Sequence, residues 1–169
     1  ELVRPEDGPP DDVRAEEDDR ADEQAGEELA AHVGVPVATS SLMQVPWVQA
    51  MLPPGKRVGL VTVSGSTLTP RHLEAAGVPS DIPREGTESG REFFRVLIRA
   101  EKDDMDVDLA EQDILDAGRR LVARHPEVGA IVLECTNMPP YAAAVQAAAG
   151  ALGGLDGVVN SAGIVAIRP

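Results

Sequence analysis

The chain of 169 residues carries 29 acidic and 15 basic side chains, which gives a net charge of −14. This length suits one domain of ordinary size or two small ones. The acidic excess argues against nucleic acid as a partner, because contact with phosphates requires a surplus of Lys and Arg. No apolar run approaches the roughly 20 residues that span a bilayer, so we expect no membrane segment. The single cysteine, Cys135, excludes an internal disulfide.

The acidic charge is concentrated in residues 1–28, which hold 13 acidic and three basic side chains. This segment also contains several prolines and cannot bury enough apolar surface to offset its chain entropy. We therefore predict an acidic disordered extension over 1–27 and a folded domain over 28–169, of which 149–169 is atypical. The first residues lack the basic and apolar pattern of a secretory signal, so we expect a cytoplasmic protein.

Strand-like and helical patterns alternate along the folded part. The predicted strands are 35–39, 57–63, 130–134, 155–159 and 164–167, with a weaker one at 78–82. The predicted helices are 42–52, 70–76, 91–99, 108–125 and 140–149. In the longest helix the apolar residues share one face, and Asp108 with Glu111 resembles a capping box. This alternation indicates βαβ units, so the predicted fold class is α/β, with a mainly parallel sheet and flanking helices.

Polar turns follow three of the predicted strands. Ligands of a parallel sheet bind beyond the carboxyl ends of its strands, where hydroxyls and free backbone N–H groups suit a carboxylate or a phosphate. The candidate binding residues are Ser40, Ser41, Ser64, Gly65, Ser66, Thr67, Thr136 and Asn137. Ser and Thr at these positions are also ordinary helix caps, so a purely structural role stays open.

Cys135 is the candidate catalytic residue. It is predicted at the end of the strand 130–134 and beside a helix start, where the helix dipole favours a thiolate. A thiol whose pKa falls from about 8.5 toward neutrality can exchange a proton near pH 7. The alternative is a buried, inert cysteine. His32, His72 and His125 lack the spacing of metal ligands, and we predict neither a metal nor a cofactor.

Four stretches resemble the aspartate/glutamate/hydantoin racemase family, over about residues 28–148. The most distinctive is Gly-Ala-Ile-Val-Leu-Glu-Cys-Thr-Asn-Met-Pro-Pro-Tyr at 129–141; the others are 35–42, 57–62 and 68–73. The resemblance implies a PLP-independent isomerase of two similar α/β lobes, in which two cysteines move the Cα proton of a small amino acid. It implies Cys135 as the second of these acid/base groups. It also implies Thr136 and Asn137 as holders of the substrate carboxylate, with the site extending to Ser64–Thr67.

The chain departs from that family at both ends. No counterpart of the lobe with the first cysteine precedes residue 28, so we expect an incomplete site that needs a partner lobe or a second copy of the chain. Two alternatives are a single-cysteine relative of the arylmalonate decarboxylase type and a non-catalytic fragment that binds a carboxylate. Residues 153–164 resemble a strand end of short-chain dehydrogenases, but the Gly-rich turn is missing and Val145 stands where a Lys should follow Tyr141, so NAD use is not expected.

Overall fold

The computed structural model describes residues 28–149 and 157–160. The chain divides into two compact units, of which the larger comprises 38–164. In the smaller unit the described residues are 28–37, and their backbone is helical over 28–33. The predicted acidic extension 1–27, the strand expected at 164–167 and most of the atypical segment 149–169 lie outside the described residues.

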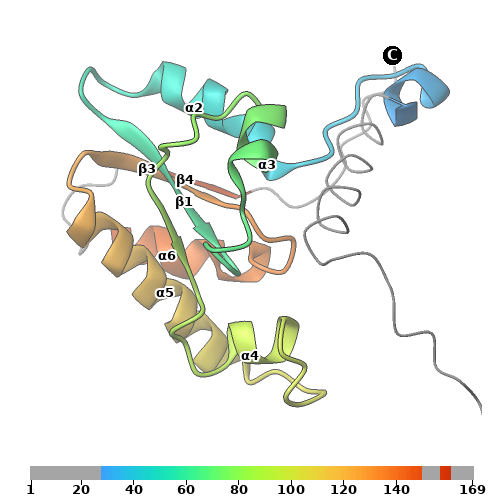
Figure 1. The fold of residues 1–169 in the computed structure, drawn as a ribbon. Coiled ribbons are helices and arrows are strands. Elements are labelled where there is room, and N and C mark those ends of the chain that lie inside the picture. The colour runs from blue at the N-terminus through green and yellow to red at the C-terminus, as the bar shows by residue number, and fades with distance from the viewer. Residues whose placement is uncertain (1–27, 150–156, 161–169) are drawn as a thin grey trace, which may run out of the picture. The chain divides into compact units, whose positions relative to one another are not determined.

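The larger unit is built on a parallel sheet with the strand order β2-β1-β3-β4 (Figure 1). Its strands are β1 (Arg57–Thr62), β2 (Arg84–Gly86), β3 (Val128–Leu133) and β4 (Gly157–Asn160). In the central pair of strands, Leu60 lies opposite Val132 and Val61 opposite Leu133. β1 and β3 are buried along almost their whole length, as expected for parallel strands that are covered on both faces. The predicted α/β fold with a mainly parallel sheet is therefore confirmed.

Helices cover both faces of this sheet (Figure 1). On one face lie η1 (Ser41–Gln44), α2 (Val45–Met51) and α3 (Pro70–Ala75), whose apolar side chains form one core cluster with the sheet. On the other face lie α4 (Phe93–Leu97), α5 (Val107–Arg124), η2 (Pro139–Tyr141) and α6 (Ala142–Ala149). The fold is therefore a three-layer arrangement of helices, sheet and helices.

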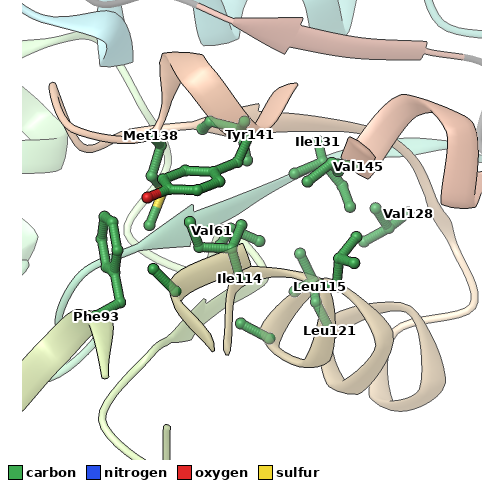
Figure 2. Close-up of a cluster of buried hydrophobic side chains, with 13 residues drawn as sticks. Val61, Phe93, Ile114, Leu115, Leu121, Val128, Ile131, Met138, Tyr141 and Val145 are labelled. Atoms are coloured by element: carbon green, nitrogen blue, oxygen red, sulfur yellow. The ribbon is translucent and has the colours of Figure 1, made fainter. Parts of the chain in front are cut away.

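The larger core cluster lies between the sheet and α5. Figure 2 shows Ile114 and Leu121 pointing from α5 toward Ile131 of β3, and all three side chains are fully buried. Phe93 and Tyr141 close one end of this cluster with an edge-to-face contact, with ring centroids 6.0 Å apart, a geometry that aromatic pairs prefer. The core therefore joins α4, α5 and the turn after β3 into one packed body.

Two predicted strands differ in the structure. Residues 35–39 form no strand: Pro36 has no N–H for a sheet ladder, and the segment leads to Ser40, whose side chain accepts the N–H of Leu42 at 3.1 Å and caps η1. The strand expected at 78–82 is replaced by turns, and β2 forms just after it at Arg84–Gly86. An edge strand of three residues gives too short a pattern to be recognised in a sequence.

The predicted long helix is confirmed as α5, but its start differs. The N-cap residue is Asp106, whose side chain accepts the N–H groups of Asp108 and Leu109 at 3.1 Å each. The prediction of a capping box that starts at Asp108 is therefore wrong. An Asp two residues earlier already satisfies the free N–H groups of the first turn.

A buried carboxylate on α5 holds the segment that precedes α4. Asp113 is 4% exposed and accepts the backbone N–H groups of Arg91, Glu92 and Phe93 at 2.9, 2.7 and 2.9 Å. Its carboxylate lies so close to Gly90 that a Cβ atom at that position would collide with it. Charge-assisted bonds of this kind compensate for the burial of one negative charge.

We predict that Asp113→Ala lowers the free energy of unfolding by about 3 kcal/mol, because it leaves buried N–H groups without acceptors. Urea denaturation of both proteins measures this loss. Asp116→Ala is the matched control on the same helix, since Asp116 is exposed and pairs only with Arg119 in the described residues; we expect a change below about 1 kcal/mol. Equal losses in the two variants would contradict the anchoring role of Asp113.

Candidate functional site

The carboxyl ends of β1, β2 and β3 lie at one edge of the sheet because the strands are parallel. Two hydrogen bonds tie the end of β1 to the residue that follows β3. The N–H of Glu134 donates to the carbonyl of Val61 at 2.9 Å, and the Thr62 hydroxyl donates to Glu134 Oε2 at 2.7 Å. Thr62 is 2% exposed, so this edge is fixed by a bond that is largely shielded from water.

Cys135 lies directly after Glu134 at this edge. It is half-buried and packs against the core cluster on the α5 side of the sheet. Its carbonyl accepts the N–H of Met138 at 3.0 Å, which closes a tight turn before the short 3-10 helix η2. The thiol is therefore at the predicted place in the sheet, but the chain does not enter an α-helix immediately after it.

The pKa of the Cys135 thiol is raised, whereas the sequence analysis expected a lowered pKa. The largest cause is burial, which penalises the charged thiolate. Hydrogen bonds from the backbone and side chain of Asn137 act in the opposite direction, and the negative charge of Glu134 raises the pKa further. The expected lowering of the Cys135 pKa by a helix start is therefore wrong, because the effect of burial is the larger one.

Most of the other candidate hydroxyls have partners within the chain. Ser40 caps η1, Ser41 donates to the carbonyl of Glu134 at 2.9 Å, and Thr67 donates to the carbonyl of Ser64 at 3.3 Å. Thr136 and Asn137 are exposed beside Cys135. The structure thus places these two residues next to the thiol, while it uses Ser40, Ser41 and Thr67 in local hydrogen bonds.

The carboxylate of Glu88, which was not among the predicted site residues, lies against the turn after β1. Glu88 Oε1 accepts the Ser64 hydroxyl at 3.1 Å, the Ser66 N–H at 3.2 Å and the Ser66 hydroxyl at 3.5 Å. These hydrogen bonds, with further ones from the backbone of Gly65 and of Glu88 itself, outweigh burial and lower the pKa of Glu88. No pattern in the sequence indicated this residue, because Glu88 follows β2, which at three residues is too short to be recognised.

Ion pairs hold β2 in place and thereby position Glu88. Arg120 and Arg124 of α5 pair with the carboxylate of Glu85 at 2.7 and 2.6 Å, and Arg120 also donates to the carbonyl of Gly86 at 3.1 Å. The backbone of the next residue is held as well, since both the N–H and the hydroxyl of Thr87 donate to the carbonyl of Val63. The turn after β2 is therefore fastened on one side to α5 and on the other to the end of β1.

A shallow surface hollow runs along β2 and reaches this turn. Its lining includes Gly65, Ser66, Gly86 and Glu88 but not Cys135.

Within the described residues, no three His, Cys, Asp or Glu side chains are grouped as metal ligands. His72 instead accepts the N–H of Thr69 at 3.1 Å and caps α3. No helix in the described ranges has the length and apolar character needed to cross a bilayer.

Comparison with known proteins finds similarity to enzymes of the lyase class. A dimethylsulfoniopropionate lyase of Durusdinium sp. clade D is 27% identical over 129 residues, which are 73% of this chain and 42% of the lyase. Dimethylsulfoniopropionate lyases 3 and 6 of Emiliania huxleyi (strain CCMP1516) are 33% and 35% identical over 123 residues, 67% of this chain and 31% of each lyase. The chain thus spans 31% to 42% of the length of these relatives. No family model and no solved structure matches it.

These relatives correct the racemase interpretation. The similar proteins are named lyases, and no racemase family model matches the chain, so the predictions of a racemase family and of an isomerase activity are wrong. The error has a chemical origin: a buried strand followed by Cys-Thr-Asn indicates a thiol beside polar groups, and that arrangement serves more than one reaction. The alternative predicted from the sequence, a single-cysteine relative of the arylmalonate decarboxylase type or a non-catalytic fragment that binds a carboxylate, agrees better with these relatives.

We predict opposite effects of two substitutions on the Cys135 thiol. Glu134→Gln should lower its pKa, because a neighbouring negative charge is removed, and Asn137→Ala should raise it, because a donor to the thiolate is lost. The rate of alkylation by iodoacetamide as a function of pH measures both shifts on the only cysteine of the chain. Shifts in the same direction would show that these neighbours do not control the thiol.

We also predict that Glu88→Gln destabilises the fold in a pH-dependent way. The folded pKa of Glu88 lies below its usual value of 4.5, so its contribution to stability is complete above that value and is lost as the pH falls through the folded pKa. Urea denaturation at several pH values should show the variant to be less stable at pH 7, with a gap that closes in acid. A gap that is independent of pH would contradict this origin.

Proposed function

We propose that this chain is part of a lyase that acts on dimethylsulfoniopropionate. The observation that carries the proposal is the similarity of 123 to 129 residues to several enzymes named for that reaction. The alignment covers two thirds or more of this chain. The similarity is therefore not confined to one of the polar turns. The site at the edge of the sheet offers the groups that such a reaction requires.

The chemistry of the substrate defines these requirements. It carries a carboxylate at one end and a dimethylsulfonium cation at the other. A base removes a proton from the carbon next to the carboxylate, the electron pair forms a carbon–carbon double bond, and the carbon–sulfur bond breaks. The products are acrylate, dimethyl sulfide and the protonated base. The enzyme therefore needs a base beside a holder for the carboxylate.

Cys135 is the proposed base. Its half-buried position beside the α5 core limits the water around it, which strengthens electrostatic interactions there. The thiol must first lose its own proton to water, and a bound sulfonium cation favours this, because an opposite charge nearby lowers a thiol pKa. Asn137 supports the thiolate through the hydrogen bonds that already oppose the effect of burial. The thiolate of Cys135 would then form only when the cationic substrate binds, which limits side reactions of the free enzyme.

Thr136 and Asn137 are the proposed first contacts for the substrate carboxylate, since both are exposed next to Cys135. The partners predicted from the sequence, a small carboxylate ligand and a partner lobe or second copy of the chain, remain proposals here. The relatives are more than twice as long as the aligned part, which supports a further lobe as the element that completes the site. The cytoplasmic location predicted from the sequence also remains a proposal.

The proposal predicts release of dimethyl sulfide and acrylate in equal amounts when the chain is incubated with dimethylsulfoniopropionate. Headspace gas chromatography and proton NMR measure the two products. We expect Cys135→Ala to reduce the rate at least 100-fold, as for loss of a general base, while the melting temperature stays close to that of the wild type. Ser89→Ala, an exposed hydroxyl after β2, is the control and should keep the wild-type rate.

The outcomes separate the proposal from its alternative. Release that survives Cys135→Ala would exclude the thiol as the base. Binding of dimethylsulfoniopropionate without product, seen in saturation-transfer NMR, would favour the carboxylate-binding module. Absence of both binding and cleavage, in the chain alone and in the chain supplied with the further lobe, would overturn the proposed function.

A further inference from the structure

The solvent-facing side of η1 and α2 is apolar. Met43, Trp47 and Met51 are 45%, 77% and 75% exposed, and they follow one another at intervals of four residues. Pro46 and Ala50 on the same two helices are exposed as well. Single apolar residues on a surface are common, but a contiguous group of large ones indicates a site of interaction. We call Met43, Trp47 and Met51 the Met-Trp-Met stripe.

The opposite side of these two helices packs against the sheet. Leu42, Val45 and Val48 are 4%, 3% and 6% exposed and belong to the core cluster that includes Leu60 of β1 and Leu73 of α3. The segment is therefore apolar on both sides, which is typical of a helix that is buried between two bodies. The sheet is one of these bodies. Within the described residues, the Met-Trp-Met stripe is the side that nothing covers.

The distribution of charge favours another protein surface as the cover of this stripe. No Asp, Glu, Lys or Arg occurs between residues 29 and 55, which is the longest such run in a chain of which 26% is charged. The centres of protein interfaces are likewise depleted of charged residues and enriched in Trp and Met. Two copies of a chain with a net charge of −14 repel each other. Contact between them is therefore favoured where the surface carries no charge.

The order of residues in the stripe fits a second copy of this chain. The two Met residues stand at equal distances from the only Trp of the chain, four residues before it and four after it. In a two-fold symmetric pair each surface meets itself, so residue i contacts residue j and j contacts i. Two such helices packed antiparallel bring Trp47 against Trp47 of the second copy, and Met43 against Met51 at both ends. The stripe is thus complementary to itself.

We propose that the Met-Trp-Met stripe is a self-association surface, on which a second copy of the chain packs antiparallel about a two-fold axis at Trp47. This inference goes beyond the proposed lyase activity, because it concerns assembly and uses no residue of the site at Cys135. Three side chains form a small surface beside the roughly 800 Å² per partner of a stable complex. We therefore expect a dissociation constant in the micromolar range, and tighter dimers at higher salt, because salt screens the repulsion between the copies.

Sedimentation velocity of the whole chain, from micromolar concentrations to roughly 0.5 mM, tests the proposal. We expect an equilibrium of monomer and dimer, and the emission of Trp47 should move to shorter wavelength over the same range as its indole leaves water. Met43→Glu or Met51→Lys alone should weaken dimerisation by about tenfold or more, because each brings a charge into an apolar contact. Val107→Glu is the control: this residue of α5 is 61% exposed, and its variant should dimerise as the wild type does.

A variant that carries both Met43→Glu and Met51→Lys tests the antiparallel arrangement itself. In that arrangement the introduced carboxylate of one copy faces the introduced ammonium group of the other at both ends. Dimerisation should therefore return at low salt, and it should now weaken as salt is added. Circular dichroism and the melting temperature should match the wild type in every variant, because all of these positions are exposed.

The same measurements can overturn the inference. A chain that stays monomeric over the whole range with Trp47 in water would exclude a second copy as the cover of the stripe. A dimer that is insensitive to the stripe variants would do the same, and failure of the double variant to recover would exclude the two-fold arrangement. Emission typical of a buried indole in the dilute monomer would also overturn the proposal, since the stripe would then be covered within one chain.

Discussion

The parallel pairing of β1 with β3 is the constraint on which the rest of this structure depends. It places Val61 opposite Leu133, so the next residues of both strands emerge at the same edge of the sheet. Burial of both strands forces their polar groups beyond the last paired residue, where Thr62 and Glu134 close the edge with a 2.7 Å hydrogen bond. Cys135 and the Ser64–Ser66 turn lie at the same edge of the sheet for this reason, although they are about 70 residues apart in the chain.

Carboxylates of the protein itself lie at this edge of the sheet. The protein's own carboxylates, those of Glu88 and Glu134, already occupy hydroxyl and N–H donors there. The pKa of the Cys135 thiol is raised by burial and by the charge of Glu134.

The fold class was predictable because the signals for it are local and strong. Runs such as Val58–Val61 and Val128–Leu133 are apolar throughout, and the stripe along α5 repeats with helical period, so each indicates its own secondary structure. Short elements such as β2 were not predictable, because their formation depends on distant parts of the chain. β2 has three residues and depends on ion pairs between Glu85 and α5, and the apolar run at 35–39 has no paired neighbour. The activity was misjudged because the Cys-Thr-Asn turn fits several reactions of carboxylates.

The sequence by itself determined the alternation of strands and helices, the place of Cys135 at the end of a buried strand, and the polar turns beside it, since all of these follow from the order of neighbouring residues. Only the tertiary structure decided what surrounds these groups. Burial and Glu134 raise the pKa of the thiol against the expected effect of a helix start, and Glu88 occupies the turn at Ser64–Ser66. Both results depend on contacts between distant segments, and the free energy of a charged group is fixed by such contacts rather than by its neighbours in the chain.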